Sequence, residues 1–179
     1  NFAYAHSFAQ AFGLLAATVF IVLIIGLLRK LIQSSEKVVE EWNHPVKSSF
    51  FGAISVGICL LAAVAYPHSE QLALIVWIVG ATFHLFAMLA VLNAWVHREN
   101  LQAAHACPVW FIPAVGNVVV PLAGVKLGFI EVSWMFFSVG LIFWLVLLSL
   151  VMYRLMFVQP PLPDRLRPTI AIFLAPPDR

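Results

Sequence analysis

The side chains that could carry chemistry in this chain are six histidines, two cysteines and scattered serines, and their spacing matches no common catalytic motif. The zinc motif HExxH, the nucleophile motif GxSxG and the glycine-rich phosphate loop are absent from the sequence. Cys59 falls in an apolar run and Cys107 in a polar connection, so they should lie at different depths and form neither a disulfide nor a metal site. We therefore expect no catalytic residue, no metal and no cofactor, and a protein that is not an enzyme.

Two histidines could instead hold a haem, which needs a pair of ligands at matching depth on neighbouring helices. His84 lies at the middle of its apolar run, whereas the other histidines lie in connections or near the ends of runs. A haem-binding membrane redox protein is therefore the less favoured reading. We interpret His84 as a neutral histidine that is hydrogen-bonded to a neighbouring helix.

The elements that hold these residues are apolar stretches long enough to cross a lipid bilayer. The chain is 63% hydrophobic and only 10% charged, against about a quarter charged in a typical soluble domain. A transmembrane helix needs about 20 apolar residues, and the five stretches that qualify are 8–32, 46–66, 72–96, 109–127 and 132–157, with a sixth beginning at Thr169. The fold class is therefore an all-α membrane protein. The net charge of +2 is too small to indicate nucleic-acid binding.

Basic residues are distributed unevenly between the connections. Eight of the ten Lys and Arg residues lie in or beside the first, third and fifth connections, and Lys126 alone lies in the second or fourth. The positive-inside rule then places loops 33–45, 97–107 and 158–167 in the cytoplasm and residue 1 outside a plasma or bacterial inner membrane.

Each predicted helix that runs outward from the cytoplasm begins at a proline, namely Pro45, Pro108 and Pro168. Proline suits the first turn of a helix, where its missing N–H has no partner in any case. The near-equal spacing predicts hairpin repeats over 45–107 and 108–167, with 1–44 and 168–179 as partial repeats of one incomplete transmembrane domain, 1–179. Three unrelated helix starts would be the simpler explanation of the prolines.

Small and polar residues are concentrated in the outgoing helices 46–66 and 109–127, which we expect to line a passage because such residues allow close helix packing or face a wet cavity. The candidate lining residues are Ser48, Phe51, Gly52, Ser55, Gly57, Phe111, Pro113, Gly116, Asn117 and Pro121. Asp, Glu, Lys and Arg are absent from the middle of all five stretches, which disfavours a proton relay or a cation pathway. Lys47 and Arg167 lie beside outgoing helix starts, where they would form a cytoplasmic vestibule for anions.

Three segments resemble the tellurite-resistance/dicarboxylate transporter family, whose relatives include the plant slow-type anion channels. They are HPVKSSFF at 44–51, PVWFIPAVGN at 108–117 and RPTIAIFLAPP at 167–177. The resemblance implies ten helices in five hairpins around a central pore, and a homotrimer when the protein is full length. This chain would span helix two to the start of helix seven, so the occluding phenylalanine of helix nine has no counterpart here.

Together these features predict transport of small inorganic anions or C4-dicarboxylates across the lipid bilayer, by a channel or a carrier. The alternative that remains beside the haem protein is a membrane assembly subunit that does not transport.

Overall fold

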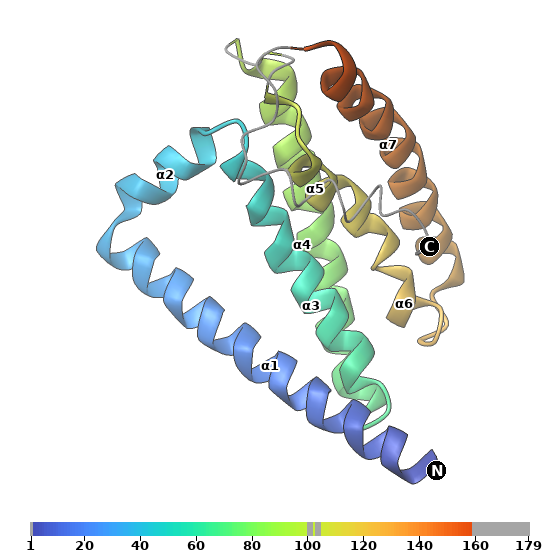
Figure 1. Ribbon diagram of the computed structural model, residues 1–179. Helices are drawn as coiled ribbons and strands as arrows, with labels where there is room; N and C mark the ends of the chain where they lie inside the picture. The colour runs from blue at the N-terminus through green and yellow to red at the C-terminus, as the bar shows by residue number, and fades with distance from the viewer. Residues whose placement is uncertain (1, 100–101, 103–104, 159–179) are drawn as a thin grey trace.

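The computed structural model describes residues 2–99, 102 and 105–158, and all regular structure in these residues is helical (Figure 1). Within them, four helical stretches are long and apolar enough to cross a membrane: Gln10–Gln33, Lys47–Ala65, Glu70–His97 and Ile130–Phe157. These match the predicted spans at 8–32, 46–66, 72–96 and 132–157, so the expected all-α membrane fold is confirmed. The predicted sixth span from Thr169 and the loop residue Arg167 lie outside the described residues.

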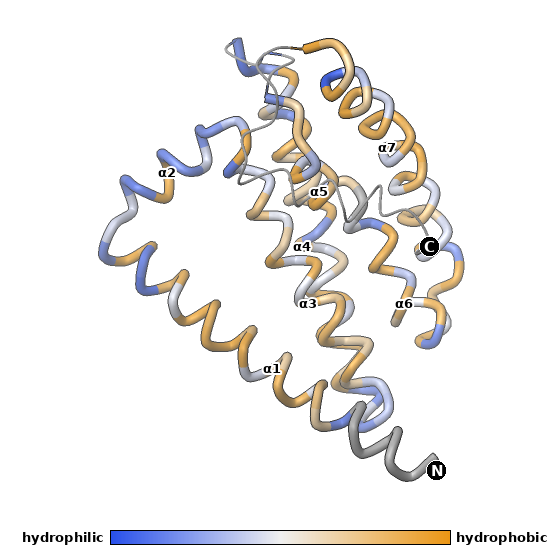
Figure 2. The backbone as a smooth tube through the Cα atoms, viewed as in Figure 1, coloured by the Kyte–Doolittle hydropathy of each residue, from blue (hydrophilic) through white to orange (hydrophobic). Residues whose placement is uncertain are grey.

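The long helices are α1 (Phe2–Gln33), α3 (Gly52–Ala65), α4 (Glu70–His97) and α7 (Ile130–Phe157). The 3₁₀ turn η1 (Lys47–Phe51) leads directly into α3. The loop predicted at 33–45 is largely helical, because α2 (Ser35–Asn43) occupies most of it. This short helix has a strongly polar face and lies at the end of α1, beyond the apolar run (Figure 2).

Helices α3 and α4 form the most extensive contact in the described chain and run antiparallel, side by side (Figure 1). The turn between them follows from local chemistry. Pro67 cannot extend α3 as an ordinary helical residue, and Ser69 begins α4 by accepting a hydrogen bond from the backbone N–H of Leu72 at 3.3 Å. Glu70 adds a negative charge to the first turn of α4, where the helix dipole favours it.

The predicted fourth span, 109–127, is not one continuous helix, and this corrects the sequence prediction. The segment consists of η3 (Pro108–Trp110), α5 (Phe111–Val115), η4 (Gly116–Val118) and α6 (Pro121–Gly124). Pro113 and Pro121 have no N–H, so each removes one backbone hydrogen bond from a regular helix. The Val120 carbonyl at the start of α6 accepts from the Gly124 N–H at 3.3 Å and also from the Trp77 indole of α4 at 2.9 Å, so a side chain of a neighbouring helix binds the broken segment.

The connection from α6 to α7 depends on Gly128, whose φ of 85° is the left-handed conformation that favours glycine. The N–H of Phe129 donates to the carbonyl of Gly124 at 2.9 Å and closes the end of the broken segment. As a result α7 returns beside α5 and α6, forming the second hairpin (Figure 1).

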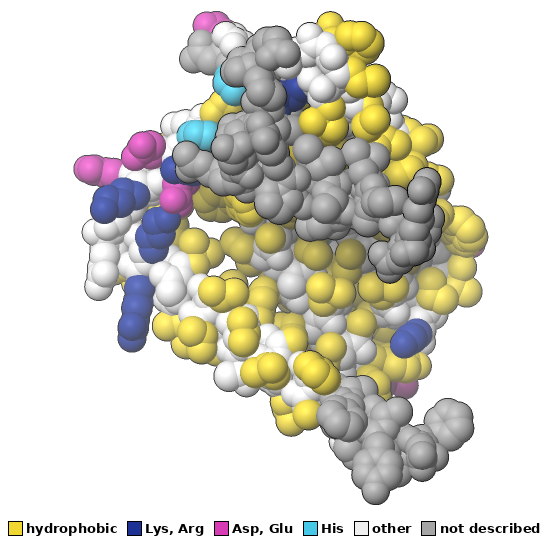
Figure 3. Space-filling model, viewed as in Figure 1, with side chains coloured by type: hydrophobic (Ala, Val, Ile, Leu, Met, Phe, Trp, Pro, Cys, Tyr) yellow, Lys and Arg dark blue, Asp and Glu magenta, His cyan; other side chains and the backbone are white. Residues whose placement is uncertain are grey.

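Apolar side chains cover the outer surface of the long helices. Leu14 is 71% exposed, Phe86 64% and Ile142 61%, which suits contact with lipid rather than water. Lys and Arg side chains gather around α2 and the adjoining end of α1, away from the apolar band (Figure 3). Figure 2 shows the same division along the backbone, with polar residues concentrated at the ends of the helices.

Candidate passage between the helices

A polar contact joins the first turn of α3 to the middle of α4. The Ser55 hydroxyl donates to the Gly52 carbonyl at 2.8 Å and lies 2.9 Å from Nδ1 of His84. Because the single hydroxyl proton is used on the carbonyl, the arrangement requires that Nδ1 of His84 donates to the hydroxyl oxygen. The predicted hydrogen bond of His84 to a neighbouring helix is confirmed, and both side chains are fully buried.

The broken segment packs against this contact through Gly116 and Asn117. A Cβ on Gly116 would lie 2.5 Å from Cε1 of His84, so only glycine permits this approach. The Asn117 amide donates to the carbonyl of Ala114 at 2.7 Å and to the sulfur of Met88 at 2.9 Å. The side chains of Ser55, His84 and Asn117 thus each donate a hydrogen bond to a neighbouring group, whereas Nε2 of His84 and Oδ1 of Asn117 have no partner among the described residues.

Helices α3 and α5 touch almost backbone to backbone. A Cβ on Gly52 would lie 2.9 Å from Cα of Pro113. Phe111, two residues before Pro113, is only 2% exposed and packs in an apolar cluster with Leu147 and Val151 of α7. These contacts fix the broken segment between α3 and α7.

Most predicted lining residues are thus placed in helix contacts and do not face open space within the described chain. Seven are buried: Ser48, Gly52, Ser55, Phe111, Pro113, Gly116 and Asn117. Phe51, Gly57 and Pro121 are half-buried. Gly57 faces the ring of Phe20 on α1. Burial also fails to separate outgoing from returning helices, since the apolar windows of η1–α3 and of α4 are each 33% buried.

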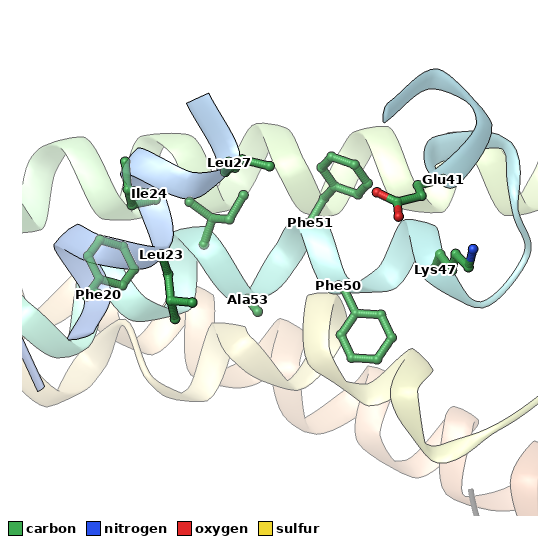
Figure 4. A pocket seen from close by; sticks show the side chains of 10 residues that line it. Phe20, Leu23, Ile24, Leu27, Glu41, Lys47, Phe50, Phe51 and Ala53 are labelled. Atoms are coloured by element: carbon green, nitrogen blue, oxygen red, sulfur yellow. The ribbon is translucent and has the colours of Figure 1, made fainter. Parts of the chain in front are cut away.

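An open pocket of about 430 Å³ lies between α1 and α3 (Figure 4). Its apolar wall includes Phe20, Leu23, Ile24 and Leu27 of α1 and Phe50, Phe51, Ala53 and Ile54 of η1–α3. Glu41 and Lys47 lie together at one end of it, so this is where two predicted site residues, Lys47 and Phe51, meet. The apolar window of α1 is only 6% buried, because few residues of the described chain cover it.

Charge at this end of the pocket is partly neutralised. Lys30 donates to Glu41 at 2.5 Å, and this hydrogen bond holds the pKa of the Glu41 carboxyl below its usual value. Lys47 is exposed, and within the part of the chain that the structure describes no carboxylate pairs with it. The Glu41 carboxylate is nevertheless close enough to interact electrostatically with Lys47.

Two arginines that the sequence had indicated only as markers of sidedness form specific contacts. Arg98, just after α4, donates to Ser48 at 3.1 Å, and Arg154, in the last turn of α7, donates to the carbonyl of Ala106 at 2.9 Å. A basic residue near the end of each returning helix was the available signal. Its spacing alone could not identify the carbonyl or hydroxyl that each guanidinium contacts.

In the described residues, no three His, Cys, Asp or Glu side chains are grouped as metal ligands. Cys59 and Cys107 are both free and buried, as their predicted separation requires.

The comparisons with known proteins agree with the sequence resemblance. A family model described as SLAC1, voltage-dependent anion channel, matches residues 2–178. An uncharacterised transporter of Methanocaldococcus jannaschii is 28% identical over 169 residues, which cover 88% of this chain and 49% of that protein. The tellurite resistance protein TehA homolog of Haemophilus influenzae is 27% identical over 174 residues, which cover 96% of this chain and 52% of that protein.

The S-type anion channel SLAH2 of Arabidopsis thaliana is 30% identical over 156 residues, which cover 86% of this chain and 30% of that protein. The chain thus spans about half the length of the archaeal and bacterial relatives. Neither a haem protein nor an assembly subunit gains support from these matches.

Proposed function

This chain belongs to the voltage-dependent anion channel family, and from that premise we propose that the protein transports small anions across a cell membrane. The match of the family model to residues 2–178 is the observation that carries the proposal. The substrates we propose are inorganic anions or C4-dicarboxylates, and the membrane is a plasma or bacterial inner membrane. A homotrimer is the proposed assembly, and the mass of the detergent-solubilised protein tests it.

The distribution of charge supports an anion rather than a cation. Ser55, His84 and Asn117 are the buried polar groups at the centre of the helices, and none carries a carboxylate that a cation would need. Positive side chains lie instead at the end where the outgoing segments begin, with Lys47 exposed beside η1. The positive end of the helix dipole points the same way.

We place the cytoplasmic mouth beside Lys47, at the charged end of the pocket in Figure 4. The buried candidates, such as Ser55 and Gly116, then act as the packed wall that holds the outgoing segments beside the passage. Phe51, Gly57 and Pro121 are the candidates that keep exposed surface and remain the proposed lining residues. Arg167 remains a proposed part of the vestibule.

The direct test is anion efflux from liposomes that contain the protein expressed from its whole gene. Chloride, nitrate and malate are loaded separately, and release is followed with an anion-selective electrode or an enzymatic assay. We expect efflux above that of protein-free liposomes for at least one of them. Equal release with and without protein for all three anions would refute the proposal.

A charge-neutralising pair of variants tests the mouth. Lys47→Gln removes one positive charge about 10 Å or less from a passing anion, worth roughly 0.4 kcal/mol in water, or about twofold in local anion concentration. Lys37→Gln is the matched control, because Lys37 is an exposed lysine of α2 away from the pocket lining. We expect only Lys47→Gln to lower efflux at low salt, with the difference shrinking as the Debye length falls from about 30 Å at 0.01 M to 3 Å at 1 M.

A further inference from the structure

Arg98 donates hydrogen bonds around the start of the first described outgoing segment, η1–α3. Its guanidinium donates to the Ser48 hydroxyl at 3.1 Å, to the His44 carbonyl at 3.4 Å and also to the Trp42 carbonyl. His44 directly precedes Pro45, where the outgoing segment was predicted to start. One side chain from the end of α4 therefore holds the chain on both sides of that start.

Arg154 makes a similar contact in the second hairpin. It lies in the last turn of α7, is only 5% exposed, and donates from Nη1 to the Ala106 carbonyl at 2.9 Å. Ala106 precedes Pro108, where the broken segment begins, by two residues. The donor again comes from the returning helix of the same hairpin as the start that it holds.

Neither guanidinium forms a salt bridge with a carboxylate of the described residues. In the described residues the recorded ion pair is Lys30–Glu41, and neither arginine has such a partner. If these arginines only set the orientation of the protein in the membrane, a basic residue anywhere in the loop would be sufficient. That role would not require several acceptors around Arg98. It would also not require burial of Arg154, which is costly for a charge and leaves Nε of its guanidinium without a hydrogen-bond partner among the described residues.

We propose that Arg98 and Arg154 are equivalent positioning residues, one in each hairpin, that fix the cytoplasmic start of their own outgoing segment and place beneath it a positive charge that pairs with no carboxylate of the described residues. The positioning part stands on the contacts alone. The effect of the charge on anions rests on the proposed function.

Two thiols can report separately on the contacts of Arg98 and on the contact of Arg154. Cys107 is a free cysteine beside Ala106 and is 1% exposed. Burial raises the pKa of its thiol more than the nearby charge of Arg154 lowers it, so the reactive thiolate is scarce while the start of the broken segment is held. Loss of the Arg154 charge alone would make the thiolate scarcer, so faster labelling in Arg154→Met can come only from exposure of the thiol. Ser49, beside Ser48, is fully buried. A Ser49→Cys substitution therefore places a reporter at the other start, in a background that also carries Cys59→Ser.

The experiment measures the rate at which a maleimide labels each thiol in the protein expressed from its whole gene, reconstituted in liposomes. Arg154→Met removes the charge and the donors, and should speed labelling of Cys107 about tenfold or more, the change expected from losing a charged hydrogen bond. Labelling of the Ser49→Cys thiol should not change. Arg98→Met should give the reverse pattern, and Arg29→Gln, at an exposed arginine of α1, should change neither.

This crossed design separates local release from unfolding. A variant that fails to fold exposes both thiols. If the arginine contact does not hold its segment in place, neither thiol becomes exposed when the arginine is replaced. Either result overturns the proposal. Arg154→Lys and Arg98→Lys keep a charge and a donor, and should restore most of the protection.

Anion efflux from the same liposomes tests the effect of the charge. Each Arg→Met variant should lower efflux at low salt by about twofold for an ion roughly 10 Å away in water, and each Arg→Lys variant should recover it. Equal efflux from the Met and Lys variants would show that the charge does not affect anion transport, and would refute that part of the proposal. A crossed thiol pattern without any efflux from the unsubstituted protein would refute the proposed function and leave the positioning role intact.

Discussion

The contact between Gly52 and Pro113 gives the sharpest prediction about how the helices are held. Gly52→Ala adds a Cβ that would lie 2.9 Å from Cα of Pro113 and 3.2 Å from its nitrogen. These are backbone atoms, so the neighbour cannot yield by rotating a side chain. The two segments must move apart, and the broken segment would shift relative to α3.

The magnitude follows from comparison with a matched glycine. At Gly26 of α1 an added Cβ meets nothing within 4 Å. Both substitutions gain the helix preference of alanine, about 1 kcal/mol, so their difference isolates the contact. Overpacking usually costs about 1–3 kcal/mol, which for a chain of this size corresponds to a melting-temperature difference of roughly 2–12 °C.

Thermal unfolding in detergent micelles, followed by far-ultraviolet circular dichroism, measures this difference. Gly57→Ala should give an intermediate result, because its Cβ would meet the end of the Phe20 side chain, which can rotate on the loosely covered α1. The expected order of melting temperatures is therefore Gly26→Ala above Gly57→Ala above Gly52→Ala. Equal melting of the Gly52 and Gly26 variants would refute the close approach of α3 and α5.

Three further predictions concern individual hydrogen bonds. Ser55→Ala leaves Nδ1 of His84 buried without its partner and should cost about 1–3 kcal/mol by the same melts; an unchanged melt would argue against the contact. Trp77→Phe removes the 2.9 Å bond to the Val120 carbonyl, which keeps its bond from the Gly124 N–H, and should cost about 0.5–1.5 kcal/mol; an unchanged melt would argue against the Trp77 bond. The hydrogen bond from Lys30 lowers the pKa of Glu41, so the contact between the two should stabilise the corner between α1 and α2 fully above pH 4.5. This stabilisation should be lost as the pH falls through the lowered pKa. Spin labels on the two helices should report this acid opening, and Glu41→Gln should abolish its pH dependence; an identical acid profile would contradict the assignment.

Membrane crossing and helix direction could be predicted from the sequence because both depend on local properties. Transfer of a run of about 20 apolar residues into lipid is favourable wherever the run lies in the chain. Four of the five predicted spans correspond to long helices, and α2, the end of α4 and the end of α7 lie toward the same end of the fold (Figure 1). The family resemblance likewise rested on short contiguous segments, and the family model confirmed it.

The continuity of the fourth span could not be predicted in the same way. Hydropathy adds over residues 109–127 whether or not the backbone is regular. Pro113 and Pro121 permitted a break, but a proline in a membrane helix can also produce only a kink. The break is stable because Trp77 and Asn117 supply donors to local carbonyls, and Trp77 lies on a different helix.

The candidate site shows the same division between local and tertiary information. Residue type identified Ser55, Gly116 and Asn117 as unusual for a lipid-facing helix, and the structure places all three in the tightest helix contacts. Whether a small polar residue faces a passage or a neighbouring helix depends on its angle around the helix and on what packs there. Tertiary structure decided that point, and it also paired Arg98 and Arg154 with their acceptors, because those atoms are about fifty positions away along the chain.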